Sequence, residues 1–246
     1  MSIRVIINGA SGKMGAIACE TIQTHPAFTL VAALGRHDDL GDQITQHQAQ
    51  IVIDLTLADC VYANALTIIE HHAHAIIGTS GLQPEQIQVL QQRCKQQQLG
   101  GIIVPNFSIG AVLMMHFSGV AARLLSEVEI VETHHQQKLD APSGTAIKTA
   151  ELIAAARTHP PQQASSQKIT LPGARGACYK DIPIHSLRLP GVLAKQHVIF
   201  GNTGETLTLA HESIDRHSFM PGLILACQRV QELKSMYYGL EKLLDL

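Results

Sequence analysis

Short apolar runs alternate with helical patterns through the first hundred residues, and this alternation limits the possible fold more than any other feature of the chain. The runs rich in isoleucine, valine and alanine are predicted strands, at residues 3–7, 30–34, 51–54, 75–78 and 101–104. Between them, residues 12–24, 58–71 and 84–98 have helical patterns. Continuous apolar strands separated by helices indicate a parallel sheet that is covered on both faces, so we predict an α/β fold.

The pattern changes after Pro105. Residues 110–126 form a predicted helix with little polar surface, and 159–167 form a loop rich in proline, glutamine and serine. Strand-like runs follow at residues 185–189, 197–200 and 206–210, with a hairpin turn expected at Asn202-Thr203-Gly204. Helix returns at 219–233. This mixture indicates a second domain of the α+β class.

The composition excludes several classes of function. The 246 residues are 46% hydrophobic and 15% charged, which is typical of a globular protein with a sizeable core. The net charge is −2 and there is no basic stretch, so a nucleic-acid partner is disfavoured. No apolar run reaches membrane-spanning length. The five cysteines are scattered singly, which favours a reducing, cytoplasmic location and argues against a zinc site.

A glycine-rich segment lies between the first predicted strand and the first predicted helix. It reads Gly9-Ala10-Ser11-Gly12-Lys13-Met14-Gly15. A dinucleotide-binding fold of the Rossmann type places its pyrophosphate turn at this point. Where the second strand ends, Gly35 stands at the position that often carries an acid for the ribose hydroxyls, and Arg36 follows it. This replacement favours NADPH over NADH, although Asp38 lies close by.

The run from Glu129 to Ala146 combines several chemical groups within one short segment. A strand-like stretch delivers His134 and His135, Lys138 follows, and Ser143-Gly144-Thr145 opens an alanine-rich helix. The first N–H groups of a helix attract anions. The run therefore indicates a site for a small carboxylated substrate with a proton donor beside it. The alternative is a capped surface helix after a solvated loop.

This run also carries a resemblance to a known family. Every fixed letter of E-x-x-E-x-H-H-x-x-K-x-D-A-P-S-G-T-A is matched, and the chain resembles the dihydrodipicolinate reductase (4-hydroxy-tetrahydrodipicolinate reductase) family along nearly its whole length. The resemblance implies NAD(P)H-dependent reduction of 4-hydroxy-tetrahydrodipicolinate to tetrahydrodipicolinate in lysine (diaminopimelate) biosynthesis. It also implies a dinucleotide-binding domain at residues 1–105 with 216–246. Residues 106–215 would form a domain with a mixed sheet that binds substrate and mediates a homotetramer.

Site residues follow from the same match, residue by residue. His134 would be the acid/base residue and Lys138 the second proton donor. The residues implied to hold the dicarboxylate substrate are His135, Ser143, Gly144 and Thr145. Those implied to bind the cofactor, NADPH or NADH, are Gly9, Ala10, Ser11, Gly12, Lys13, Met14, Arg36, Gly78, Thr79, Ser80, Val104, Pro105, Asn106 and Phe107. No metal site is expected.

The chain departs from the commonest family pattern at three further places. Leu55 replaces a phenylalanine, the region between Gly41 and Gln50 is short, and Gln196 occupies the position of a family histidine. His197 comes one residue later, so it would face the other side of a strand.

Two other functions remain open from the sequence. One is a related two-domain dehydrogenase acting on aspartate or homoserine, which would lack the 129–146 run. The other is a regulator that senses a dinucleotide without turnover, which would need no acid beside the cofactor.

Overall fold

The chain folds into two compact units in a computed structural model that describes residues 2–160, 168–244 and 246. The first unit combines Met1–Ile109 with Arg216–Leu246, and the second is Gly110–Asp215. The first boundary therefore follows residue 109, where residue 105 was expected. The reason is that Phe107 is buried in the first unit. Its carbonyl oxygen lies so close to Gly222 that a side chain at position 222 would not fit. The predicted polar loop at 159–167 lies, after Pro160, outside the described residues.

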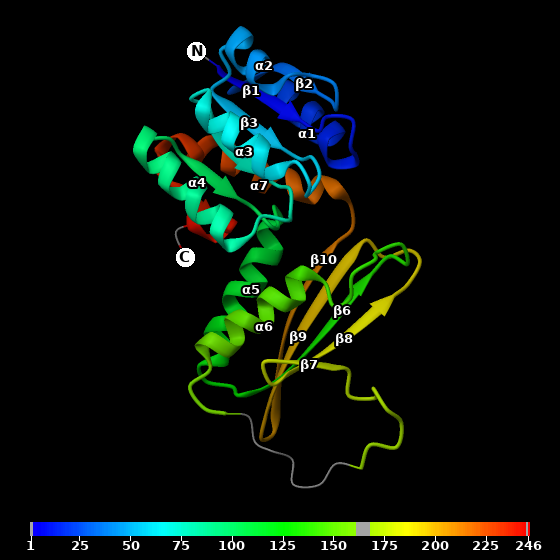
Figure 1. The fold of residues 1–246 in the computed structure, drawn as a ribbon. Coiled ribbons are helices and arrows are strands. Elements are labelled where there is room, and N and C mark those ends of the chain that lie inside the picture. The colour runs from blue at the N-terminus through cyan, green and yellow to red at the C-terminus, as the bar shows by residue number, and fades with distance from the viewer. Residues whose placement is uncertain (1, 161–167, 245) are drawn as a thin grey trace. The chain divides into compact units, whose positions relative to one another are not determined.

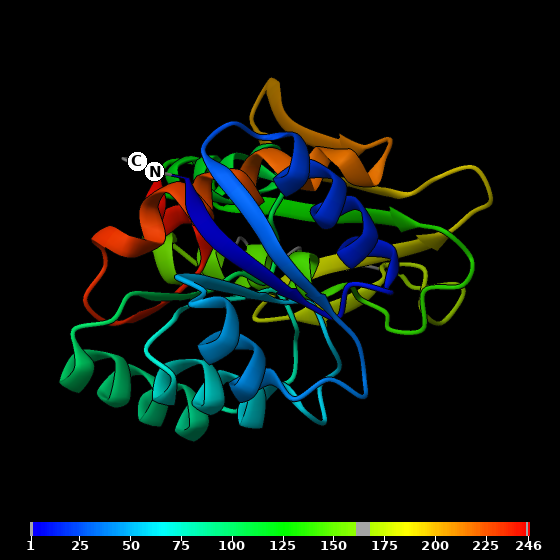
Figure 2. The same ribbon diagram turned by 90° about the horizontal axis from the view of Figure 1, so that it is seen from above.

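The first unit is built on a six-stranded sheet in the order β11-β5-β4-β3-β1-β2 (Figures 1 and 2). All neighbouring strands are parallel. The strands are β1 (Ile3–Asn8), β2 (Phe28–Leu34), β3 (Ile51–Asp54), β4 (His74–Ile77), β5 (Gly101–Ile103) and β11 (Met236–Tyr238). The predicted parallel sheet is confirmed.

Helices cover both faces of this sheet. They are α1 (Lys13–Thr24), α2 (Leu40–His47), α3 (Val61–Glu70), α4 (Pro84–Gln97) and α7 (Met220–Arg229), and α7 is preceded and followed by 3-10 turns at Arg216–Phe219 and Val230–Glu232. A further 3-10 turn spans Leu240–Leu243. Side chains from α2, α3 and α4 share one core with Ile6, and α1 contacts α7. Ile6 and Ile7 on β1 point to opposite faces of the sheet, and both are fully buried because helices cover both faces.

One helix and one strand of the first unit were not predicted. The α2 sequence is largely polar, and Ile44 is its single large buried side chain. The helix begins because Asp39 accepts a hydrogen bond from the Asp42 backbone N–H at 2.9 Å. Strand β11 is only three residues long and is defined by its pairing with β5. Neither segment has enough apolar periodicity to be recognised locally.

The second unit contains a five-stranded sheet in the order β10-β9-β6-β8-β7. Its strands are β6 (Glu127–His134), β7 (Ala177–Tyr179), β8 (Ile182–Arg188), β9 (Ala194–Asn202) and β10 (Glu205–Ser213). Only β6 and β8 are parallel, so the predicted mixed sheet is confirmed. The helices α5 (Ile109–Ala122) and α6 (Gly144–Ala156) belong to this part of the chain. Within the described residues, no helix is long and apolar enough to cross a bilayer.

A charged residue lies among the apolar side chains on the buried face of the second sheet. Glu132 on β6 is fully buried, between Ile130 and the end of the strand. The Arg188 guanidinium on β8 donates to both of its carboxylate oxygens, at 2.9 and 3.0 Å. Burial opposes ionisation of Glu132, but hydrogen bonds from His134, Arg188 and Ser186 outweigh it and lower the pKa of this carboxyl to about 2.

The depressed pKa of Glu132 predicts how stability changes with pH. A carboxyl group whose pKa falls on folding contributes its stability above the unfolded pKa, and this contribution is lost as the pH falls toward the folded value. Glu132→Gln should lower the free energy of unfolding by ~3–5 kcal/mol at neutral pH, because Arg188 loses its partner. The difference from wild type should shrink below about pH 4.5.

Urea denaturation of both proteins between pH 7 and pH 3.5 tests this expectation. Glu129→Gln is the matched control, because Glu129 lies on the same strand in half-exposed ion pairs with Arg175 and His185. Its loss should cost less than about 1 kcal/mol. A wild-type minus Glu132→Gln difference that stays constant across the pH range would contradict the assignment.

Candidate active site

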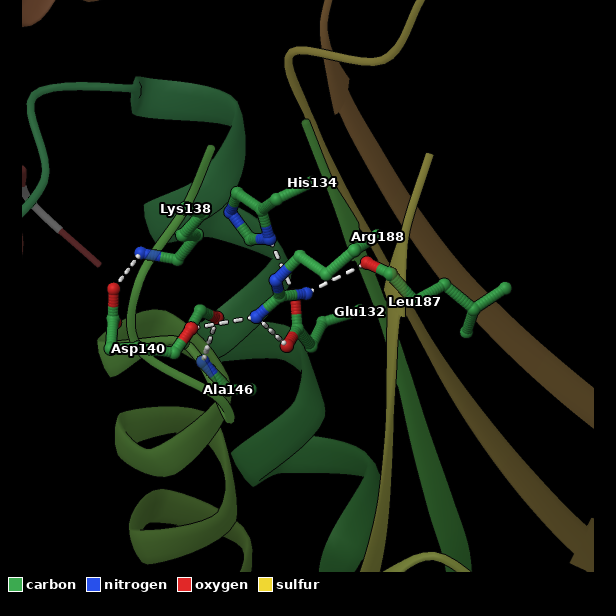
Figure 3. Close-up of polar contacts among 8 residues, drawn as sticks. Glu132, His134, Lys138, Asp140, Ala146, Leu187 and Arg188 are labelled. Atoms are coloured by element: carbon green, nitrogen blue, oxygen red, sulfur yellow. Dashed lines mark hydrogen bonds and ion pairs between the residues drawn. The ribbon is translucent and has the colours of Figure 1, made fainter. Parts of the chain in front are cut away.

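His134 is the last residue of β6, and its ring is anchored by the buried Glu132. Residues two apart on a strand face the same side, so both side chains point the same way. The His134 Nδ1 lies 2.5 Å from Glu132 Oε2. Because an ionised carboxylate only accepts hydrogen bonds, Nδ1 carries a proton and the opposite nitrogen, Nε2, is left to exchange one. Figure 3 shows this pair beside Arg188, Lys138 and the loop before α6.

The loop that follows β6 is tied back to the same group. Lys138 Nζ donates to Asp140 Oδ1 at 2.8 Å, and this hydrogen bond lowers the pKa of the Asp140 carboxyl. Arg188, besides binding Glu132, donates to the Asp140 backbone carbonyl at 2.7 Å. One arginine therefore holds both the strand and the loop that carries the lysine (Figure 3).

His135 lies just past the strand end, where alternation of side chains no longer applies. Its carbonyl accepts from the Lys138 backbone N–H at 3.1 Å, which closes a tight turn. The ring atom Nδ1 of His135 is buried and receives no hydrogen bond from the described residues. A buried ring nitrogen without a partner is costly, and a ligand that bonds to it would remove that cost.

The N-terminus of α6 lies open at the end of this loop. Ser143 is buried and caps the helix, accepting from the Ala146 backbone N–H at 3.2 Å. Gly144 is exposed, and a side chain there would meet no heavy atom within 4 Å. Thr145 is half-buried, and the first turn has no acidic side chain. The helix therefore presents its positive end without a competing carboxylate.

Gln196, not His197, faces α6. Gln196 pairs with Glu132 across β6 and β9, and its Nε2 donates to Thr149 Oγ1 at 2.8 Å. Thr149 in turn donates to the carbonyl of Thr145 at 2.7 Å. His197 pairs with Val131 and lies on the other face of the sheet. The residue at the family's histidine position therefore braces the first turn of α6.

The glycine-rich segment of the first unit fits a pyrophosphate. Gly9 has φ +91°, and a side chain there would lie 2.5 Å from the Leu55 carbonyl oxygen. A side chain on Gly15 would lie 2.1 Å from the Gly9 carbonyl oxygen, so α1 packs directly on the turn. Helix α1 starts after Gly12 with no side-chain cap and no acid in its first turn. Its first N–H groups can therefore take an anionic ligand.

Seven further predicted cofactor residues follow the ends of β4 and β5. A side chain on Gly78 would lie 2.7 Å from both Leu55 Cδ2 and Phe107 Cε2. Leu55, which replaces the family's phenylalanine, therefore packs closely against Gly78. Thr79 is buried, whereas Ser80 is exposed. Nearby, Val104 is buried, Pro105 is exposed, and Asn106 Oδ1 accepts from the Ser108 backbone N–H at 2.8 Å.

At the end of β2, two opposite charges occupy neighbouring positions. Arg36 is exposed. The Asp38 carboxylate folds back and accepts from the Gly35 backbone N–H at 2.7 Å. A carboxylate therefore does lie at this strand end, although it comes from a residue further along the chain than expected.

The sequence analysis assigned no role to three residues of the second unit, Glu132, Arg188 and Gln196, although it placed Gln196 at the position of a family histidine. The spacing Glu132-x-His134 was a usable signal, because it places both side chains on one strand face. Arg188 and Gln196 come from other strands, and no local pattern connects them to His134. In the described part of the chain, no three His, Cys, Asp or Glu side chains are grouped to hold a metal ion.

Two family models together match nearly the whole chain. The model of the dihydrodipicolinate reductase N-terminus matches residues 3–107, and that of the C-terminus matches residues 110–244. A solved structure of a dipicolinate-bound dihydrodipicolinate reductase from Paenisporosarcina sp. TG-14 superposes with a TM-score of 0.92 at 41% identity, covering 99% of this chain and 100% of that one. An amine dehydrogenase from Mycobacterium smegmatis, at 12% identity and a TM-score of 0.68, shares the fold alone.

Relatives of known name are similar over their full length. The 4-hydroxy-tetrahydrodipicolinate reductase of Legionella pneumophila (strain Corby) is 60% identical over 244 residues, which cover 99% of this chain and all of that protein. The enzyme of the same name from Coxiella burnetii (strain Dugway 5J108-111) is 48% identical over the same length and with the same coverage. With both family models and these relatives matched end to end, the chain belongs to the dihydrodipicolinate reductase family.

Proposed function

We propose that this protein reduces 4-hydroxy-tetrahydrodipicolinate to tetrahydrodipicolinate with a nicotinamide cofactor, in lysine (diaminopimelate) biosynthesis. The observation that carries the proposal is the arrangement at the end of β6. There a histidine anchored by a buried carboxylate lies in the same loop region as a lysine and an open helix N-terminus. The bound cofactor supplies a hydride, the reaction takes up one proton, and one water molecule leaves.

His134 is the acid/base residue of this proposal. Glu132 is its positioning residue, because the hydrogen bond to Nδ1 fixes the ring and directs Nε2 toward the substrate side. Arg188 acts on His134 through Glu132, which it keeps ionised and oriented. The ring can then give up a proton at one defined atom without reorganising.

Lys138 is the second proton donor. Its ammonium group is held by Asp140, whose side chain is 61% exposed, so a substrate carboxylate or hydroxyl can share or replace this partner. Two cations, Lys138 and Arg188, flank the loop through Asp140. Arg188 is already paired with Glu132, so Lys138 is the cation that becomes available to a dianionic substrate when a substrate carboxylate replaces Asp140.

The substrate carboxylates bind at His135 and at the start of α6. Gly144 allows close approach to the backbone, Thr145 adds a hydroxyl, and Ser143 keeps the helix start in place as its cap. The hydrogen bonds from Gln196 to Thr149 and from Thr149 to the Thr145 carbonyl hold this turn in place from the side of the sheet.

In the first unit, the residues around the glycine-rich turn and the ends of β4 and β5 hold the cofactor. Gly9, Ala10, Ser11, Gly12, Lys13 and Met14 take the pyrophosphate, and Gly78, Thr79, Ser80, Val104, Pro105, Asn106 and Phe107 lie toward the nicotinamide ribose. We propose that NADPH is used at least as well as NADH, with Arg36 binding the 2′-phosphate.

A homotetramer in the cytoplasm is also part of the proposal. Its support is the second sheet, whose face opposite to Glu132 leaves Leu187 exposed. Sedimentation equilibrium of the purified protein measures the assembly directly.

The first prediction concerns His134. His134→Gln should lower kcat by ~10²-fold or more, because a positioned acid typically contributes that much. The affinity for NADPH should stay near that of wild type, since His134 lies in the other unit from the glycine-rich turn. His197→Gln, on the opposite sheet face, is the matched control and should change kcat little. Near-normal turnover in His134→Gln would remove this residue from the catalytic role.

The second prediction concerns the N-terminus of α6. Pyridine-2,6-dicarboxylate should inhibit competitively with substrate, and Gly144→Val should raise its inhibition constant by about 10- to 100-fold, the scale of lost charged hydrogen bonds. The variant should fold normally because a side chain at this position meets no other atom. Gly144→Ala should have a smaller effect, because its methyl group extends less far. Unchanged inhibition in a folded Gly144→Val protein would refute the carboxylate site.

The third prediction concerns the end of β2. Arg36→Ala should weaken NADPH binding by about 1.5–3 kcal/mol and barely change NADH binding. Asp38→Asn should have the opposite effect on the preference, because it removes the carboxylate that faces the same strand end. KM values for both cofactors in the three proteins test this pair of expectations. A wild-type preference for NADH, or equal losses for both cofactors in Arg36→Ala, would exclude the role of Arg36.

A further inference from the structure

A second buried carboxylate lies in the first unit, at the point where the direction of the sheet reverses. The chain runs from β1 outward to β2 and then returns past β1 to β3, β4 and β5. Asp54 is the last residue of β3, and it pairs in register with Asn8, the last residue of β1. Open α/β sheets bind their ligands beyond the carboxyl ends of the strands at this switch point.

Asp54 is fully buried, and uncharged groups supply its hydrogen bonds. Its Oδ1 accepts from the hydroxyls of Thr56 and Thr79, each at 2.7 Å, and from the Thr56 backbone N–H at 3.3 Å. Its Oδ2 accepts from the side-chain amides of Asn64 at 2.8 Å and Asn8 at 3.1 Å. All five partners donate, so the surroundings suit an ionised carboxylate. Among the described residues, no cation is paired with Asp54.

This arrangement differs from what a purely structural hydrogen-bond centre would need. Burying a carboxylate without a cation costs free energy that burying an amide does not. An asparagine at position 54 would have the same shape and could still accept from Thr56 and Thr79. The amides of Asn8 and Asn64 could turn over to accept from it. Hydrogen bonding and packing therefore do not account for the negative charge.

We propose that the charge of Asp54 shifts the equilibrium of the bound nicotinamide cofactor toward its oxidised form. The inference rests on the proposed function, in which the cofactor binds at this edge of the sheet. Loss of a hydride removes two electrons and one proton from the ring, so the ring changes from neutral to a single positive charge. A fixed negative charge in a water-poor interior stabilises the positive ring and not the neutral one. The phosphates have the same charge in both forms, so their repulsion by Asp54 cancels from the comparison.

The test is the ratio of two dissociation constants, measured on the full-length protein without turnover. NADPH binding is followed by the fluorescence of the reduced ring, and NADP⁺ binding by its displacement of NADPH. Asp54→Asn should raise the ratio Kd(NADP⁺)/Kd(NADPH) by about three- to tenfold, the effect of two unit charges roughly 12–25 Å apart at an effective dielectric constant of about 20. Both constants can also change together, because the turn around Asn8 and Thr56 is held by the same group.

Asn64→Ala is the matched control. It removes one hydrogen bond to Asp54 Oδ2 and another to Thr56 Oγ1, but it keeps the charge. It should change both dissociation constants by the same factor and leave the ratio as in wild type. Where Asp54→Asn does not fold, Asp54→Ser removes the charge and leaves room for a bridging water, and the same ratio is measured.

The outcomes separate the two proposals. A ratio that is unchanged in a folded, charge-free variant overturns the role of Asp54 while leaving the reductase function standing. A ratio that moves equally in Asn64→Ala also overturns it, because the effect would then come from packing. A wild-type protein that binds neither form of the cofactor overturns the proposed function itself.

Discussion

The ionised carboxylate of Glu132, buried on β6, is the constraint on which the second unit depends. A buried charge costs a large free energy unless it is paired and hydrogen-bonded. Arg188 meets this demand from β8, and His134 meets it from two residues further along β6. Satisfying Glu132 therefore requires the pairing of β6 with β8 and, at the same time, one orientation of the histidine ring.

The pairing of Glu132 with Arg188 also fixes the loop that follows β6. Arg188 has donors to spare, and one of them binds the Asp140 carbonyl in the loop that carries Lys138. The loop then leads to Ser143, which caps α6. A single electrostatic requirement thus organises the acid, the cation and the helix N-terminus, and the stability of this unit is coupled to the geometry of its site.

The two units bury a carboxylate in different ways. Glu132 is paired with the Arg188 guanidinium, so its charge is largely neutralised where it lies. Asp54 is held by hydroxyl, amide and peptide donors, which orient it without cancelling its charge. The first arrangement suits a group that must hold a partner in place. The second suits a group whose field acts on a neighbouring ligand, as we propose for the cofactor.

Local patterns in the sequence determined the elements and the chemical groups of this protein. The apolar runs predicted the parallel sheet, the glycine-rich turn predicted its ligand edge, and the run from Glu129 to Ala146 predicted the histidines, the lysine and the helix start. These features could be read because each depends on residues that are close along the chain. The short polar helix α2 and the three-residue strands β7 and β11 lack that periodicity and were missed.

Only the tertiary structure decided which distant groups meet. Arg188 lies 56 residues from Glu132, and Thr79 lies 25 residues from Asp54. No spacing rule connects such pairs, because strand order and register bring them together, and register also decided that Gln196 rather than His197 faces α6. The sequence by itself thus determined which reactive groups are present. The fold decided which of them are buried, oriented and charged, because burial and long-range pairing exist only once the strands are assembled.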